Sequence, residues 1–251
     1  MRKGNNEGST LVLSVIVPAY REAATIFETL RILLDCLENL GYPYEVVLVP
    51  DGRRDDTAAQ ASRHLGRVRI SEYEEHRGKG YAIRHGIQQC RGRYIAYIDA
   101  DNELHPDAIG SLLEMVMAGA DVALGSKRHP GSSINYPWFR RVQSFLYQRL
   151  IRLMFDLDVT DTQTGLKVFD GDLLRSVAPS LTSDGFALDL ELLVALRDRG
   201  ATFVEGPVSL DYRFKSTIGA GAIVLVLLDT LRIYYRQRIR KRRRDRRSMA
   251  G

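Results

Sequence analysis

The sequence predicts an α/β fold in which a mostly parallel sheet is flanked by helices. Short apolar, β-branched runs alternate with segments of helical periodicity through residues 11–125, which is the pattern of consecutive βαβ units. The chain has 251 residues, of which 45% are apolar, enough for one large α/β domain or two small ones.

The first half supplies the most regular elements. Residues 11–17 (LVLSVIV) form a continuous apolar run that ends at Pro18, as in a buried parallel strand. The segment at 55–65 is expected to be a helix with Asp55 or Asp56 as its N-cap. The other elements expected here are strands at 44–49, 68–71, 94–98 and 121–125 and helices at 22–40, 79–90 and 106–117.

The second half is less regular. We expect a helix at 140–155, a loop and short strand at 161–168, a helix at 188–199, a strand at 204–212 and an apolar stretch at 218–228. The resulting division is a disordered N-terminus at 1–10, a globular domain at 11–217, and a C-terminal amphipathic helix with a basic tail at 218–251.

The net charge of +5 belongs to the tail. Residues 232–247 contain ten Arg or Lys and one Asp, a local charge of +9, so the rest of the chain is near −4. A nucleic-acid-binding domain would spread basic residues over a folded face, and no aromatic platform accompanies this run. We therefore expect no nucleic-acid partner.

The cysteines indicate a reducing compartment. Cys36 and Cys90 lie in apolar segments without metal-ligand spacing, so we expect two buried free thiols rather than a disulfide. The polar residues 1–10 show no signal peptide.

Three polar clusters follow predicted strands: PAYRE at 18–22, Asp51-Gly52, and DAD at 99–101. Right-handed crossovers bring the carboxyl ends of parallel strands to one edge, where open α/β sheets bind ligands. These clusters should therefore meet.

Asp99 and Asp101 carry the predicted chemistry. They follow the strand at 94–98 one residue apart, so both carboxylates can face one hard cation, Mg²⁺ or Mn²⁺. Glu103 is a candidate third ligand. An acidic turn before the next helix would show the same pattern, but the other clusters on this edge favour a metal site.

Six motifs occur in order: VIVPAYRE (15–22), VPDGRRD (49–55), RGKGYAIRHG (77–86), DADNE (99–103), GSK (125–127) and DTQTGLK (161–167). Together they resemble glycosyltransferase family 2 of the GT-A fold, and within it the polyprenyl-phosphate (dolichol-phosphate) mannose and glucose synthases. The resemblance spans about residues 11–215. The sequence departs from the family pattern at Arg21, where Asn is usual, and at Pro50 and Arg53 in the nucleotide loop.

The resemblance implies a role for each matching residue. The nucleotide-sugar would contact Pro18, Tyr20, Glu22, Asp51, Asp99, Ala100 and Asp101. The metal would be held by Asp99, Asp101 and Glu103. The catalytic residues would be Asp99, Asp101, Lys127 and Arg140.

Lys127 and Arg140 would bind the acceptor and donor phosphates, although each taken singly also fits an ordinary surface charge. Lys215 lies near the terminal lysine of the family pattern as a weak phosphate ligand, while Thr217 occupies the better-aligned position.

The acceptor decides whether the reaction needs a base. In-line displacement at the anomeric carbon predicts inversion and a β-linked product. A lipid phosphate is already anionic and needs only basic residues to hold it, whereas a hydroxyl needs a carboxylate base. The DTQTGLK motif and the pair Lys127 and Arg140 favour a polyprenyl phosphate, with GDP-mannose or UDP-glucose as donor class and mannose favoured.

Two alternatives stay open. One is transfer to a sugar or small-molecule hydroxyl with Asp189 as the base. Asp189 and Glu191 are the obvious base candidates in the second half, although both would also complement the dipole of a helix N-terminus. The other is a catalytically inactive nucleotide-sugar-binding protein, in which Pro50 and Arg53 mark the lost activity.

The C-terminus favours a peripheral membrane location. Residues 218–228 are too short to span a bilayer, which takes ~20 apolar residues. The apolar residues that follow, ahead of the Arg/Lys run, suit an interfacial helix on anionic lipid; a helix docked on the domain with a solvated tail is the alternative. We expect a cytoplasmic protein on the inner face of the cell membrane.

Overall fold

The computed structural model describes residues 11–64, 66–134, 138–211 and 227–239, with the backbone alone for 138–146. Its strands are β1 (Leu13–Ala19), β2 (Tyr44–Pro50), β3 (Val68–Ile70), β4 (Tyr94–Ile98), β5 (Val122–Ser126), β6 (Ser133–Ile134), β7 (Leu166–Asp170), β8 (Phe203–Pro207) and β9 (Ser209–Leu210). Its helices are α1 (Ile26–Asn39), α2 (Thr57–Ala61), α3 (Lys79–Gln89), α4 (Ala108–Met117), α5 (Trp138–Phe155), α6 (Gly171–Val177), α7 (Leu188–Arg197) and a further helix at 227–239, with short 3₁₀ turns at Ser62–His64 and Ala178–Ser180.

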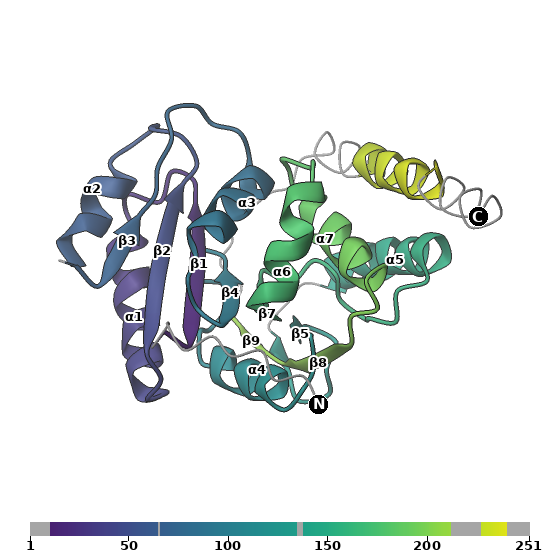
Figure 1. The fold of residues 1–251 in the computed structure, drawn as a ribbon, viewed down its shortest axis with the longest axis horizontal. Coiled ribbons are helices and arrows are strands. Elements are labelled where there is room, and N and C mark those ends of the chain that lie inside the picture. The colour runs from purple at the N-terminus through teal and green to yellow at the C-terminus, as the bar shows by residue number, and fades with distance from the viewer. Residues whose placement is uncertain (1–10, 65, 135–137, 212–226, 240–251) are drawn as a thin grey trace, which may run out of the picture.

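In this part of the chain, seven strands form one sheet in the order β3-β2-β1-β4-β7-β5-β8, and β6 pairs with β9 (Figure 1). The neighbours in the sheet are parallel except β7, which runs antiparallel to both β4 and β5. The predicted class, a mostly parallel sheet flanked by helices, is therefore confirmed. The sequence indicated a strand near β7 but not its direction.

The antiparallel strand has a consequence for the site. Leu166, the first residue of β7, pairs with Ile98, the last residue of β4. The loop that precedes β7 therefore lies at the edge where β4 ends, and the DTQTGLK motif meets the DAD motif there.

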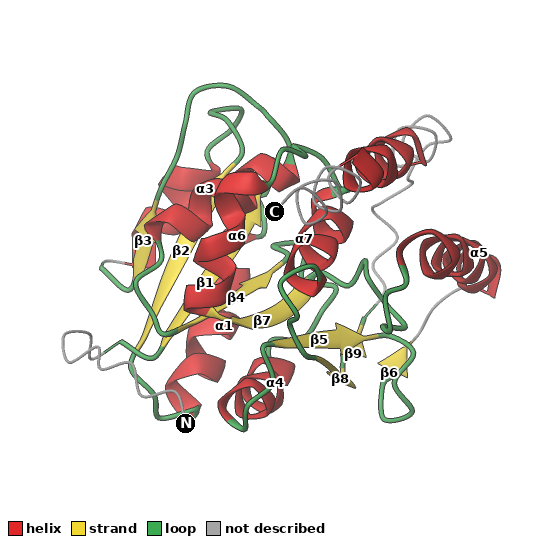
Figure 2. Cartoon of the chain, turned by 45° about the vertical axis from the view of Figure 1, so that its right-hand side comes forward, coloured by secondary structure: helices red, strands yellow, loops and turns green. Residues whose placement is uncertain are grey.

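The sheet separates two hydrophobic layers. Helices α1 and α4 cover one face, and α3, α6 and α7 cover the other (Figure 2). Alternate residues of β1 divide between them, with Val15 and Val17 facing α1 and Ile16 facing α3. Full burial of each such side chain stabilises the fold by about 1.5–3 kcal/mol.

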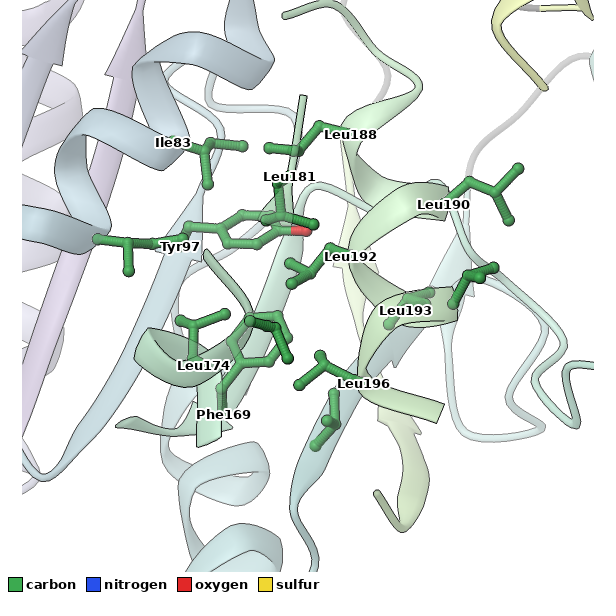
Figure 3. Packing of buried hydrophobic residues seen from close by; sticks show 14 of the residues in the cluster. Ile83, Tyr97, Phe169, Leu174, Leu181, Leu188, Leu190, Leu192, Leu193 and Leu196 are labelled. Atoms are coloured by element: carbon green, nitrogen blue, oxygen red, sulfur yellow. The ribbon is translucent and has the colours of Figure 1, made fainter. Parts of the chain in front are cut away.

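Tyr97 of β4 has a special place in the layer that contains α7. Its ring lies among Leu181, Leu188 and Leu192, and its hydroxyl points toward α7 (Figure 3). A buried phenol needs a polar partner there.

Element boundaries differ from the predicted ones where side chains compete for the backbone. The helix expected at 55–65 is shortened to α2 and a 3₁₀ turn. Asp55 Oδ1 accepts the Thr57 N–H at 3.1 Å, whereas Asp56 makes no capping hydrogen bond. Helix α6 was not predicted.

Both cysteines are free, as expected, but only Cys90 is fully buried. Cys36 is half-buried, and its thiol donates to Asp107 Oδ1. Burial raises the pKa of each thiol to about 12.

The helix at 227–239, yellow in Figure 1, docks on α5 and α7. Thr230, Ile233 and Gln237 are buried on one face. The Tyr147 and Thr230 hydroxyls lie 3.0 Å apart, and Gln237 donates to Asp198. The docked arrangement weighed above therefore holds for these residues; residues 1–10, 212–226 and 240–251 lie outside the described chain.

The opposite face of this helix is apolar and exposed. Leu228, Leu231, Tyr235 and Ile239 project from it, with Leu231 55% and Tyr235 70% exposed. Within the described ranges, every helix is too short or too polar to cross a membrane.

Candidate active site

Asp99 lies at the carboxyl end of β4, pressed against the DTQTGLK loop. Its N–H donates to the Gly165 carbonyl at 3.0 Å. A Cβ atom on Gly165 would lie 1.9 Å from Asp99 Oδ2, so any side chain at this position would push away either the carboxylate or the loop. The glycine thus lets the loop support the carboxylate directly.

Lys79, the first residue of α3, holds the Asp99 carboxylate. Its Nζ lies 2.6 Å from Asp99 Oδ1 and 2.8 Å from Oδ2. A second carboxylate oxygen, Asp189 Oδ2, lies 4.0 Å away. Burial alone would lower the pKa of Lys79, but the charges of Asp99 and Asp189 outweigh it and raise that pKa.

Asp189 lies deeper, in a buried ion pair. Lys167 Nζ donates to Asp189 Oδ1 at 2.7 Å and to the Thr164 carbonyl at 2.6 Å, and the Tyr97 hydroxyl donates to the same carboxylate oxygen. Burial opposes the charged form, but Lys167 and Lys79 lower the pKa of Asp189.

The surroundings of Asp189 argue against the base considered for a hydroxyl acceptor. Its side chain is 4% exposed, and its low pKa makes it a weak proton acceptor. Charges therefore alternate from the site into the core: Asp99, Lys79, Asp189, Lys167.

The RGKG motif docks the loop that leads to α7. The N–H groups of Gly80 and Tyr81 donate to the Asp184 carbonyl at 2.8 and 3.2 Å. A Cβ on Gly80 would lie 2.7 Å from the Gly185 carbonyl oxygen, and Gly78 has a φ of 105°. The glycines thus bring Asp189, four residues beyond Gly185, behind Lys79.

Sequence reasoning missed Lys79 and Lys167 as site residues. A lysine in the first turn of a helix opposes the helix dipole, and a lysine within a buried strand needs a counter-charge. Both were signals that paired carboxylates lie nearby.

Asp101 is the second carboxylate of the pair. Burial and the charge of Asp99 raise its pKa, and its Oδ1 accepts the Glu103 N–H at 3.0 Å. Throughout the described residues, no three or more His, Cys, Asp or Glu side chains gather as a metal-binding group. The role of Glu103 as third ligand stays a prediction, whereas Asp99 and Asp101 lie near enough for their charges to interact.

This pair fits a divalent cation. Burial and the neighbouring Asp99 disfavour the charged form of Asp101, and a positive ion would relieve that cost. Mg²⁺ characteristically uses one or two carboxylates and completes its shell with phosphates and water. Gln163 Nε2 and Thr164 Oγ1 are buried without a hydrogen-bond partner in the described chain, as on a surface that a ligand or water completes.

Among the residues predicted to contact the nucleoside, Tyr20 is exposed, whereas the others are buried or hydrogen-bonded within the protein. Tyr20 is 41% exposed and its ring lies 4.3 Å from the His76 ring, so it offers a stacking surface. Pro18 is buried within β1, and Glu22 accepts a hydrogen bond from Thr25. Ala100 is buried beside the metal pair.

Asp51 does not offer a free carboxylate to a nucleoside. It is 3% exposed, and it accepts hydrogen bonds at 2.8 Å from the Tyr73 hydroxyl and from the backbone N–H groups of Arg77 and Gly78, with His76 Nδ1 at the same distance. Its role in this structure is to hold the loop at 73–78.

The predicted phosphate ligands are only partly described. Lys127 Nζ lies 3.8 Å from the buried carboxylate of Asp161, which also accepts the Lys127 N–H at 3.2 Å. Arg140 lies on α5 where the backbone alone is described. Lys215 and Thr217 lie outside the described residues; Asp211, just before that segment, donates its N–H to the Glu103 carbonyl.

Several proteins of known name are similar to this chain in sequence. The chain is 31% identical over 202 residues to glycosyltransferase AglD of Haloferax volcanii, an overlap of 78% of this chain and 32% of the relative. It is 34% identical over 205 residues to dolichyl-phosphate beta-glucosyltransferase of Drosophila melanogaster (74% and 63%), and 27% over 208 residues to polyprenol monophosphomannose synthase of Mycolicibacterium smegmatis (79% and 77%). The chain thus spans about a third of AglD and about two thirds of the glucosyltransferase.

Solved structures share the fold. Mannosyl-3-phosphoglycerate synthase from Rubrobacter xylanophilus superposes with a TM-score of 0.67 at 19% identity, over 90% of this chain and 74% of the other. Glucosyl-3-phosphoglycerate synthase from Mycobacterium tuberculosis, in complex with Mn²⁺, UDP and phosphoglyceric acid, gives 0.65 at 20% identity, over 87% and 78%. The fold is therefore GT-A. Residues 14–177 match the profile of glycosyl transferase family 2, so the chain belongs to that family.

Proposed function

We propose that this chain is a metal-dependent, inverting glycosyltransferase that moves a hexose from a nucleotide-sugar to a polyprenyl phosphate. The observation that carries the proposal is the Asp99 and Asp101 pair at the end of β4, held against the DTQTGLK loop. Relatives named for dolichyl-phosphate glucosylation and for polyprenol monophosphomannose synthesis support the acceptor class.

Asp99 and Asp101 would hold Mg²⁺ or Mn²⁺, which when bound supplies positive charge to the leaving diphosphate. Tyr20 would stack on the base of the donor, and the chain around Asp51 would shape its pocket. The donor class is GDP-mannose or UDP-glucose, and mannose is the sugar we favour.

The acceptor phosphate would attack the anomeric carbon without a general base, because its oxygen is already anionic. Basic residues are needed to hold it, and Lys127 together with Arg140 and Lys215 would serve. A reaction without a general base agrees with the surroundings of Asp189, whose carboxylate accepts hydrogen bonds from Lys167 and Tyr97. We accordingly prefer lipid phosphate to a hydroxyl acceptor.

A peripheral membrane location follows from the same acceptor. The exposed apolar face at Leu228, Leu231, Tyr235 and Ile239 would lie in the headgroup region of the inner face of the cell membrane. The basic run at 232–247 would meet anionic lipid.

A donor panel tests the proposal. The full chain is incubated with short-chain polyprenyl phosphate, Mg²⁺ or Mn²⁺, and either GDP-mannose or UDP-glucose, and the product is identified by mass and anomeric configuration. We expect a β-linked hexosyl phosphate that disappears with EDTA and in Asp99→Asn/Asp101→Asn. Transfer to a hydroxyl acceptor alone, retention of configuration, or full activity in EDTA would contradict it; donor binding with no transfer to any acceptor would favour the inactive binding protein.

A further inference from the structure

We propose that Lys79 is a movable counter-ion: it neutralises Asp99 while no metal is bound, and its ammonium passes to Asp189 when a divalent cation occupies Asp99. The inference rests on the proposed function, since it concerns the same metal pair. It assigns Lys79 and Asp189 as positioning residues for cation binding.

The first observation is that Lys79 takes the carboxylate a cation would need. Its Nζ lies within 2.8 Å of both Asp99 oxygens. An ammonium in that position and a divalent cation on the same oxygens exclude each other, by contact and by charge repulsion. Lys79 must therefore leave Asp99 before Asp99 can bind a metal.

The second observation is that a second carboxylate, that of Asp189, lies beside the Lys79 ammonium. The hydrogen bonds to Asp189 from Lys167 and Tyr97 both end on Oδ1, whereas Oδ2 faces Lys79 at 4.0 Å. A movement of little more than 1 Å would bring Nζ into hydrogen-bond range of that oxygen. The ammonium would thus move from the Asp99 carboxylate to the Asp189 carboxylate without being buried among apolar side chains alone.

The third observation is that only the side chain has to move. The backbone on either side of Lys79 is fixed, because Gly78 and Gly80 pack against the chain at 183–185. The lysine side chain is 17% exposed and has four flexible methylene groups. The same docked loop fixes Asp189 at the start of α7, so the two end positions of the ammonium are built into the fold.

Lys79 therefore acts as a latch, which here means a side chain that opposes cation binding until it moves to Asp189. Lys79 should weaken the binding of a divalent cation to the free protein, and Asp189 should offset that effect by receiving the ammonium. Removal of Lys79 and removal of Asp189 should therefore have opposite effects, and the effect of Asp189 should depend on the presence of Lys79.

Titration with Mn²⁺ alone, followed by the electron paramagnetic resonance signal of the free ion, measures this without any turnover. The proteins are the full chain, Lys79→Met, Asp189→Asn, the double variant and Asp99→Asn/Asp101→Asn. We expect about tenfold tighter binding in Lys79→Met and about threefold weaker binding in Asp189→Asn. In the Lys79→Met background, Asp189→Asn should change the affinity by less than about twofold.

Arg77→Gln is the matched control. It removes one positive charge two residues away, where the guanidinium carbon lies 4.0 Å from the centroid of the Tyr81 ring. Its Mn²⁺ affinity should equal that of the unaltered chain. If Asp189→Asn does not fold, because Lys167 is left without its partner, Lys167→Met/Asp189→Asn removes the acceptor with no net change of charge and takes its place in the cycle.

The outcomes separate this inference from the proposed function. Equal Mn²⁺ affinity in the unaltered chain and in Asp99→Asn/Asp101→Asn would overturn both, because the aspartates would not form the metal site. Binding that depends on the aspartates but does not tighten in Lys79→Met would overturn only the latch. An equal effect of Asp189→Asn in both backgrounds would show a through-space charge effect and overturn the transfer.

Discussion

Gly165 and Asp99 touch so closely that a methyl group on the glycine would meet Asp99 Oδ2 at 1.9 Å. Gly165→Ala should therefore displace either the carboxylate or the loop. A shift of about 1 Å in a catalytic group costs on the order of 100-fold in rate, so we expect a fall of that size in kcat/KM, measured with the active donor. Gly185→Ala is the control, since a Cβ there has no atom within 4 Å. Full activity in Gly165→Ala would exclude Asp99 from the reaction.

Arg21 holds a left-handed backbone conformation, with φ at 58°, at the position where the family pattern has Asn. Asn adopts this conformation more readily than other residues with a Cβ. Arg21→Asn should raise the free energy of unfolding by roughly 0.5–1 kcal/mol relative to Arg21→Ala, measured in urea. Because both variants lose the same charge, their difference isolates the backbone. An Arg21→Ala protein as stable as Arg21→Asn would refute the explanation.

The ion pair between Lys167 and Asp189 should be costly to break from one side. Lys167→Met leaves Asp189 buried and charged, which should cost about 3–5 kcal/mol in the free energy of unfolding. Lys167→Met/Asp189→Asn removes both charges and should cost less than Lys167→Met. Urea denaturation of both proteins measures the difference. A double variant less stable than Lys167→Met would mean that other contacts of Asp189, such as the Tyr97 hydroxyl, dominate.

Docking of the helix at 227–239 should depend on pH through Glu191. This carboxylate accepts the N–H groups of Thr182 and Ser183 and lies 3.3 Å from Arg236. Burial opposes its charge, but the hydrogen bonds from Ser183 and Thr182 and the charge of Arg236 lower its pKa below 4.5. The stabilisation that ionised Glu191 contributes is therefore complete above pH 4.5, its ordinary pKa, and is lost as the pH falls through the lower pKa that Glu191 has in the folded protein.

Hydrogen exchange at 227–239 reads this out. Protection factors, which are corrected for the pH dependence of intrinsic exchange, should fall at acid pH, and Glu191→Gln should reproduce this loss of protection at pH 7. Glu28→Gln is the control, because Glu28 pairs with Arg31 on the distant surface of α1. Protection unchanged in Glu191→Gln would show that apolar packing alone holds the helix.

The exposed face of the same helix should govern attachment to lipid. Leu231→Glu/Tyr235→Glu places two negative charges on that face and should reduce flotation with anionic vesicles at least tenfold, by loss of buried apolar area and by repulsion. Tyr42→Glu places a negative charge at an exposed aromatic residue in the turn that follows α1 and should float normally. Unreduced flotation of the double variant would leave the basic run as the sole attachment.

The sheet, and the position of Asp99 and Asp101 at the end of one of its strands, could be predicted from the sequence because they depend on local patterns; a metal at these two residues stays a prediction. A β-branched run followed by DAD gives β4 and Asp99 together, since the strand fixes where its last residue lies. The direction of β7 could not be predicted from the sequence, because a five-residue strand has the same residue pattern in either orientation. Its antiparallel pairing with β4 and β5 depends on contacts between residues distant in the sequence, which no local pattern records.

The buried part of the site, formed by Lys79, Lys167 and Asp189, could also not be predicted from the sequence. Lys79, Lys167 and Asp189 are 22 or more residues apart in sequence, so the two lysines could indicate that carboxylates lie nearby but not which carboxylates they are. Their pairing arises only after the chain at 184–189 packs against the start of α3 and against β7. The hydrogen bonds that the loop at 73–78 donates to the Asp51 carboxylate could not be predicted for the same reason, and contact of Asp51 with a nucleoside stays a prediction.

The position of β7 between β4 and β5 also governs the order of assembly. Until residues 166–170 have left the ribosome, β4 and β5 each present an open edge where their shared neighbour belongs. Such edges invite pairing with other chains, and the closing contact spans about 70 residues, which slows folding. Truncation of the chain before β7 would therefore yield an aggregation-prone fragment rather than a smaller enzyme.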